Sequence, residues 1–189
     1  MSFKKRLWHT LRLCLIRSGI KRAEYIKQKD VYGGIGDNCM IMPRKVPLYP
    51  KLIRIGNNVR IASNVTFVTH DDVHNMLNTK FRDVTFIEKI GCIDIWDNVF
   101  VGADTKIMYN VRIGSNVIIA SGSVVTKDVP SNTIVAGIPA KPIGTFEDFV
   151  QRKRLNNNDY PIEIKPRKQH IKEELVNLMW AQFEKKREQ

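Results

Sequence analysis

Histidine is the side chain best suited to exchange protons at neutral pH, because its ordinary pKa is about 6.5. The chain of 189 residues has four histidines, and two of them, His70 and His74, stand close together in the sequence. His9 and His170 fall in flanking segments that we expect to be helical, and they carry no functional signal. His70 and His74 are therefore the candidates for proton transfer.

Lysine and arginine are the second group of interest, because they bind anionic ligands. The chain holds 31 Lys and Arg against 19 Asp and Glu, a net charge of +12. Residues 1–30 alone hold nine basic and two acidic side chains. A nucleic-acid-binding protein would need a basic stripe on its folded body. Because the excess of positive charge lies mostly in residues 1–30 and not on the body, we expect no nucleic-acid partner.

A six-residue repeat occupies the middle of the chain and must position these side chains. Aliphatic residues recur at every sixth position, at Ile95, Val101, Ile107, Ile113, Ile119 and Val125. A helix with 3.6 residues per turn cannot keep this period on one face, whereas flat six-residue sides joined by turns can. The repeat predicts a mainly β fold, a solenoid of stacked parallel strands with the aliphatic side chains inside.

The predicted corners of the solenoid are marked by glycine and asparagine. Glycines such as Gly102 and Gly114 follow the aliphatic residue, where we expect the backbone to turn tightly. Asparagines stand three positions after it, at Asn38, Asn58, Asn64, Asn98, Asn110 and Asn116. We expect these asparagines to adopt the left-handed conformation, which Asn tolerates better than most residues.

Two interruptions break the repeat, over about residues 42–54 and 68–94. A solenoid has little concavity of its own, so a site is most easily built where a loop leaves it. His70 stands at the start of the second interruption. We therefore expect the site there.

We expect three parts in the chain: a basic helical extension over residues 1–30, the solenoid over 31–144, and a connector with a C-terminal packing helix over 145–189. Leu7, Leu11, Cys14 and Leu15, with Trp8 beside them, follow helical spacing, and Ser18-Gly19 is the expected break. This helix either packs on the body with its charges solvated, the reading we favour, or lies on an anionic membrane surface.

The C-terminal helix is expected from about residue 168. Its apolar stripe consists of Ile171, Leu175, Leu178, Met179 and Phe183. Residues 151–167, which include Asn156-Asn157-Asn158, are expected to be irregular.

The compartment is predicted from cysteines and hydropathy. The three cysteines are odd in number and widely spaced, which favours a reducing cytoplasm over a disulfide framework. No apolar run reaches about 18 residues, so no transmembrane helix is expected. We expect a cytoplasmic protein with no secretory signal, one that can lie peripherally at the inner membrane face through residues 1–30.

The repeat, of the form [LIV]-[GA]-x-x-[STV]-x, resembles that of the hexapeptide-repeat acyltransferases over about residues 31–144. The tail Ser123–Pro130 with Ile134–Ile143 resembles the end of the β-helix in maltose, galactoside and xenobiotic acetyltransferases. The basic N-terminus, with His70 between Thr69 and Asp71, looks most like enzymes that acetylate sugars of capsule or lipopolysaccharide precursors. The resemblance implies a left-handed parallel β-helix with flanking N- and C-terminal α-helices, assembled as a homotrimer with its sites between subunits.

The resemblance also implies roles for individual residues. His70 matches the histidine that opens the extended loop and acts as general base, with His74 as the alternative. Contacts with coenzyme A are implied at Gly102, Ala103 and Ser121 for the thioester and pantetheine, at Thr126 and Lys127 for the phosphates, and at Lys141 as a further basic residue. Tyr109-Asn110 replaces a common Pro-Gly pair, so that Tyr109 can narrow or line the cofactor groove.

The expected function is acetyl transfer from acetyl-CoA to a saccharide hydroxyl, with no metal required. Asp71, Asp72 or a backbone carbonyl would orient the imidazole. The alternatives are an N-acetyltransferase of an amino sugar, nucleotide sugar or xenobiotic, and a solenoid scaffold without activity. A zinc-dependent solenoid resembling carbonic anhydrase ranks low, because it needs three histidines and the repeat region holds only His70 and His74.

Overall fold

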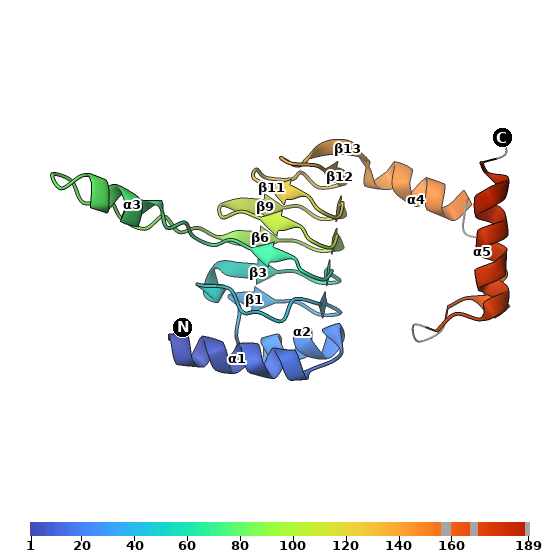
Figure 1. The fold of residues 1–189 in the computed structure, drawn as a ribbon, viewed down its shortest axis with the longest axis horizontal. Coiled ribbons are helices and arrows are strands. Elements are labelled where there is room, and N and C mark those ends of the chain that lie inside the picture. The colour runs from blue at the N-terminus through green and yellow to red at the C-terminus, as the bar shows by residue number, and fades with distance from the viewer. Residues whose placement is uncertain (156–159, 167–169, 188–189) are drawn as a thin grey trace. The chain divides into compact units, whose positions relative to one another are not determined.

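The computed structural model describes residues 1–155, 160–166 and 170–187 and divides into two compact units, Met1–Phe146 and Glu147–Gln189. The first unit is a left-handed parallel β-helix whose coils stack one above another (Figure 1). The predicted fold class is confirmed.

Short strands form the three sides of the coils. Sheet A has the order β1-β3-β6-β9, sheet B the order β13-β12-β10-β7-β4-β2, and sheet C the order β11-β8-β5. All neighbours pair in parallel except β12 and β13, which pair antiparallel at one end. The strands are β1 Gly34–Ile35, β2 Met40–Ile41, β3 Ile53–Ile55, β4 Arg60–Ile61, β5 Thr66–Phe67, β6 Ile93–Ile95, β7 Val99–Val101, β8 Lys106–Ile107, β9 Val111–Ile113, β10 Val117–Ile119, β11 Val124–Val125, β12 Thr133–Ala136 and β13 Lys141–Thr145.

The interior is filled by the side chains that the repeat predicts. The six aliphatic residues from Ile95 to Val125 at six-residue spacing are all buried. Two polar residues, Thr105 and Ser123, are buried with them, and both hydroxyls donate to the carbonyl oxygen of Ala120. The buried polar groups are thus satisfied inside an otherwise apolar core.

The corners follow the sequence prediction for asparagine but not for glycine. All six predicted asparagines have a positive φ, between 52° at Asn58 and 60° at Asn64. Gly36, Gly56, Gly102 and Gly114, in contrast, have no positive φ. Glycine is required there because the next coil is too close: a Cβ on Gly114 would lie 2.6 Å from the backbone nitrogen of Ser131.

Both predicted interruptions leave the stack at corners. Phe67 pairs with Ile107, 40 positions on, whereas Ile107 pairs with Val125, 18 positions on. The extra length is the segment between β5 and β6, which carries the helix α3 (Val73–Lys80) away from the stack (Figure 1). The shorter interruption, between β2 and β3, ends in a single 3₁₀ turn, η1 (Pro50–Leu52).

Two helices, α1 (Phe3–Leu15) and α2 (Gly19–Gln28), cover the first coil (Figure 1). Ser18 caps α2, as expected for a break at Ser18-Gly19. The helix α1 packs on the body as expected, but through His9 and Leu13. The predicted stripe of Leu7, Leu11, Cys14 and Leu15, with Trp8, faces solvent instead.

The second unit contains α4 (Phe146–Leu155, which begins in the first unit), the 3₁₀ turn η2 (Ile162–Ile164) and α5 (Glu173–Lys185). The expectation of irregular structure is wrong for residues 151–155, which are helical in α4. Asn156-Asn157-Asn158 lie outside the described residues. The predicted C-terminal helix is α5, but it begins at Glu173, so that Ile171 of the predicted stripe precedes it; Leu175 is buried and Phe183 exposed. Among the described helices, none is long and apolar enough to cross a membrane.

Close stacking of the coils makes a specific prediction for Gly114. The substitution Gly114→Ala forces a Cβ against the backbone of Ser131, so the coils must separate. Overpacking of this kind costs about 1–3 kcal/mol in free energy of unfolding. Chemical denaturation should show this loss. The control Gly144→Ala has no atom within 4 Å of the new Cβ and should unfold like the wild type. Equal stability of the two variants would contradict the stacking explanation.

Candidate active site

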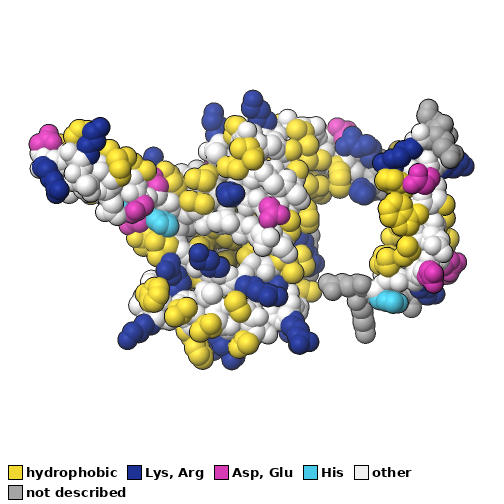
Figure 2. Space-filling model, viewed as in Figure 1, with side chains coloured by type: hydrophobic (Ala, Val, Ile, Leu, Met, Phe, Trp, Pro, Cys, Tyr) yellow, Lys and Arg dark blue, Asp and Glu magenta, His cyan; other side chains and the backbone are white. Residues whose placement is uncertain are grey.

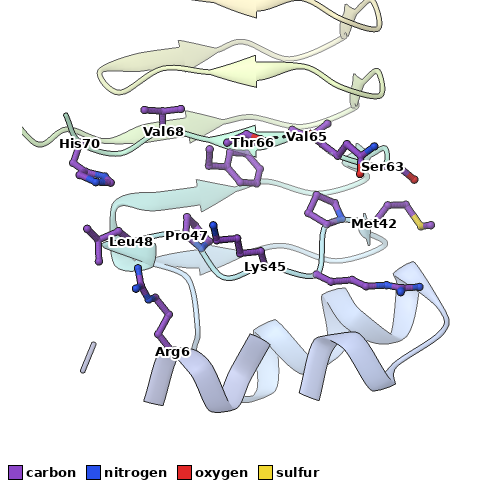
Figure 3. Close-up of a pocket in the computed structure, with 14 residues that line it drawn as sticks. Arg6, Met42, Lys45, Pro47, Leu48, Ser63, Val65, Thr66, Val68 and His70 are labelled. Carbon is purple, nitrogen blue, oxygen red and sulfur yellow. Dashed lines mark hydrogen bonds between the residues drawn. The ribbon is translucent and has the colours of Figure 1, made fainter. Parts of the chain in front are cut away.

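His70 is positioned by the corner at which the chain leaves sheet C. It follows β5 by three residues and forms an antiparallel bridge with Ile90, where the chain returns. Its half-buried side chain lines a cavity of about 770 Å³. In Figure 3 the imidazole points into this cavity, toward the segment that contains Pro47 and Leu48. A general base needs this combination of a fixed backbone and an open face.

The two interruptions meet beside His70. The buried hydroxyl of Thr69 donates to the carbonyl oxygen of Leu48. The carbonyl oxygen of Thr69 accepts from the backbone nitrogen of Gly91 at 3.0 Å. The residue before His70 is therefore held by the first interruption on one side and by the end of the second on the other.

Tyr49 contacts the imidazole directly. Its ring meets that of His70 edge to face, with centroids 5.7 Å apart and an interplanar angle of 89°. The Tyr49 hydroxyl donates to Glu88 Oε2 at 2.6 Å, and this bond raises the pKa of Tyr49 above its ordinary value. Tyr49 also has a left-handed backbone conformation, with φ of 51°. A non-glycine residue in this region costs energy and persists only where its surroundings fix it.

Neither aspartate that follows His70 orients its ring. Asp71 accepts from the hydroxyl of Tyr109 at 2.8 Å, and this bond lowers the pKa of Asp71. Asp72 accepts from the side-chain amide of Asn75. Within the described part of the chain, no hydrogen-bond partner reaches Nδ1 of His70. Among the described residues, the ring of Tyr49 makes an edge-to-face contact with the imidazole.

Tyr109 makes two contacts with the second interruption, and its place in the cofactor groove stays a prediction. Its hydroxyl donates to Asp71 and its ring lies 5.4 Å from Lys89 Nζ. It thus ties the corner of the next coil to both ends of the segment that carries α3.

Three predicted cofactor residues lie at the corner between sheets B and C. Gly102 and Ala103 follow β7, and Ser121 follows β10 in the next coil. A Cβ on Gly102 would lie 2.4 Å from the backbone nitrogen of Ser121, and Ala103 accepts a backbone hydrogen bond from Gly122 at 2.8 Å. The structure brings these three residues together.

Of the other predicted cofactor residues, Thr126 and Lys127 lie toward the opposite edge of sheet C, whereas Lys141 belongs to β13 of sheet B. Thr126 and Lys127 follow β11, and both are exposed. When the register of β5, β8 and β11 is continued, Lys127 falls level with Thr69, two coils away. That separation corresponds to about 10 Å. Lys141, also exposed, follows Ala140, whose nitrogen donates to Val124 of β11.

The cavity also contains basic residues that the sequence analysis did not select. Arg6 of α1 and Arg44 and Lys45 of the first interruption line it together with His70. No spacing signal connects these residues, because α1 and residues 42–48 meet only in the folded chain. His74 lies on α3 and does not line this cavity. No cluster of three or more His, Cys, Asp or Glu suited to a metal ion occurs in the residues described.

Comparison with known proteins gives one family match and many relatives. Residues 95–127 match the model "Bacterial transferase hexapeptide (six repeats)". The chain is 41% identical over 129 residues to protein CapG of Staphylococcus aureus, covering 67% of this chain and 73% of that protein. It is 38% identical over 112 residues to galactoside O-acetyltransferase of Escherichia coli, covering 59% of this chain and 52% of that protein.

A solved structure supports the likeness in three dimensions. A galactoside acetyltransferase in complex with coenzyme A superposes with a TM-score of 0.55 and 27% identity. The match covers 80% of this chain and 84% of that structure.

Proposed function

Because the chain belongs to the hexapeptide-repeat transferase family, we propose that it is an acetyltransferase that moves an acetyl group from acetyl-CoA to a saccharide hydroxyl in surface polysaccharide biosynthesis. The observation that carries the proposal is the placement of His70. It faces a large cavity at one edge of sheet C, and most of the residues predicted to bind coenzyme A lie along both edges of that sheet.

In the proposed reaction, His70 acts as general base. Its imidazole takes the proton of the acceptor hydroxyl as that oxygen attacks the thioester carbonyl carbon. The new C–O bond gives a tetrahedral oxyanion, which a backbone N–H stabilises. The C–S bond then breaks, and the thiolate of coenzyme A takes the proton back from the imidazolium. The products are the O-acetyl saccharide and free coenzyme A, without a covalent acyl-enzyme.

The proposed donor site follows the two edges of sheet C. The backbone of Gly102, Ala103 and Ser121 offers hydrogen bonds to the thioester and pantetheine end. The cationic Lys127 and Lys141, with the hydroxyl of Thr126, suit the phosphates, because charge-assisted hydrogen bonds to phosphate are strong.

In this proposal the enzyme is a homotrimer with each site between two subunits. Light scattering should therefore return the mass of a trimer.

The proposal is tested by the release of free coenzyme A in the presence of a panel of saccharides. The variant His70→Ala should lose about 10²–10⁴-fold in kcat, the usual contribution of a general base, with little change in KM for acetyl-CoA. His74→Ala is the matched control and should retain wild-type activity. Loss of activity in His74→Ala with retention in His70→Ala would contradict the assignment. Turnover of amino sugars but not of hydroxyl acceptors would favour the N-acetyltransferase alternative.

The exposed face of α1 supports a peripheral contact with an anionic membrane. Trp8, Leu11 and Leu15 are 53–75% exposed, and Lys4, Lys5 and Arg12 are exposed on the same helix. Figure 2 shows hydrophobic and basic side chains next to one another over α1 and α2. A helix with this pattern binds at the headgroup boundary of anionic lipids.

We place the enzyme in the cytoplasm, at the inner membrane face. Its three unpaired cysteines suit that compartment.

Vesicle sedimentation tests this contact. The wild type should bind vesicles that contain phosphatidylglycerol and should bind pure phosphatidylcholine weakly, because the basic residues require anionic lipid. Leu11→Ser with Leu15→Ser should weaken binding about tenfold or more, because two exposed apolar side chains no longer enter the bilayer. The control Ile87→Ser changes a residue that is 85% exposed elsewhere and should bind normally. Unchanged binding of the double variant would contradict the contact.

A further inference from the structure

The cavity beside His70 is cationic. Of the 14 residues that line it, Arg6, Arg44 and Lys45 carry a positive charge and none is Asp or Glu. They come from two elements, the helix α1 and the first interruption. The cavity therefore gathers positive charge from segments that are almost 40 positions apart in sequence.

A fourth cation stands behind the cavity wall. Arg22 is fully buried, and its guanidinium donates to the carbonyl oxygens of Ile41, Ile16 and Arg17. It also approaches the sulfur of Met42, a lining residue, at 3.2 Å. Burial lowers the pKa of Arg22, and the positive charge of Arg44 lowers it further. The two cations therefore act on each other at this end of the cavity.

The lining cations are not neutralised by carboxylates. The ion pairs found among the described residues involve Lys27, Lys51, Arg54 and Arg112, none of which lines the cavity. Arg6 instead lies over the ring of Phe3, 5.8 Å from its centroid. In Figure 3 its side chain rises from α1 toward Leu48 and His70. An anionic ligand in the cavity would supply the missing negative charge.

The rest of the lining suits a saccharide. Pro43, Pro47, Leu48 and Val68 give an apolar surface, and Ser63 and Asn64 give polar groups. A volume of about 770 Å³ lies within the usual range for small-molecule sites. The cavity thus combines an apolar wall for the sugar ring, a candidate base and a cluster of cations.

We propose that the acetyl acceptor is an anionic saccharide whose carboxylate or phosphate is bound by Arg6, Arg44 and Lys45 while one of its hydroxyl groups reaches His70. This inference rests on the proposed acetyltransferase function. It restricts the acceptor to sugar acids and phosphorylated sugars, including nucleotide-linked and lipid-linked sugars, and separates this chain from enzymes that take neutral galactosides.

Equilibrium binding of three matched probes tests the proposal: D-glucose, D-glucuronate and α-D-glucose 1-phosphate. Titration calorimetry on the full-length chain at low salt should show one or both anions binding about tenfold or more tightly than glucose, since charge-assisted hydrogen bonds add that much. Added salt should shrink the preference, because these cations are open to solvent. A preference for glucuronate alone would identify a carboxylate as the bound group, and one for the phosphate alone would identify a phosphate.

Charge-reversal variants show where the preference arises. Arg44→Glu and Lys45→Glu change exposed side chains, so the fold should persist, and each should abolish the preference for the anions. Arg82→Glu is the matched control: it makes the same charge change at an exposed residue outside the cavity and should keep the preference. Equal loss in Arg82→Glu, or survival of the preference in both cavity variants, would overturn the proposal.

Binding of acetyl-CoA, measured in the same samples, distinguishes a failure of the anionic acceptor from a failure of the acetyltransferase function. If the chain binds acetyl-CoA but binds neither anion more tightly than glucose, the anionic acceptor is wrong and the acetyltransferase function stands. If acetyl-CoA does not bind, the proposed function itself fails.

Discussion

The structure depends on in-register stacking of successive coils. Each strand must lie about 4.8 Å from the strand of the next coil, and most inward positions hold an apolar side chain that meets its equivalents above and below. The pairing of Phe67 with Ile107 and of Ile107 with Val125 shows that this register survives a large change in the length of chain between coils. Inserted residues can therefore leave the stack only at a corner, where they break no strand pairing. The same constraint explains the glycines that face the next backbone and the asparagines that carry the left-handed turns.

The position of the site follows from where the two interruptions leave the stack. Both interruptions depart near sheet C, and the start of the second is held to the later part of the first by the hydrogen bond from Thr69 to Leu48 and by the ring of Tyr49 against His70. His70 is held by its backbone bridge to Ile90 and contacted by the ring of Tyr49, while its side chain lines a cavity formed by the first interruption and α1. Because α1 also covers the end of the stack, the element that caps the fold supplies one of the cavity's cations, Arg6. In the proposed enzyme, donor and acceptor would approach His70 from different directions, the donor along sheet C and the acceptor from this cavity.

Much of the fold could be predicted because each coil repeats the same local requirement. The buried aliphatic residues from Ile95 to Val125 and the six left-handed asparagines follow directly from position in the repeat. The position of His70 at a corner was also predictable, since it stands where the repeat stops. The reason for glycine at Gly114 was not, because it depends on the distance to Ser131 in the next coil. The roles of Tyr49 and Arg6 depend on segments without a repeat, so no spacing reveals them. For α1, spacing identified the apolar stripe but not the direction it faces, because His9 and Leu13 pack in its place.

The central claim is that this solenoid binds acetyl-CoA along sheet C, and thermal unfolding with and without acetyl-CoA tests it most directly because no acceptor is needed. At 100 times its dissociation constant the donor should stabilise the folded chain by about 2.7 kcal/mol, which raises the midpoint of unfolding by several degrees. The shift should shrink in Lys127→Ala. The control Lys21→Ala removes an exposed lysine of α2, which is not part of sheet C, and should keep the shift. A midpoint that does not move at millimolar acetyl-CoA would contradict the claim, and with it the role proposed for His70.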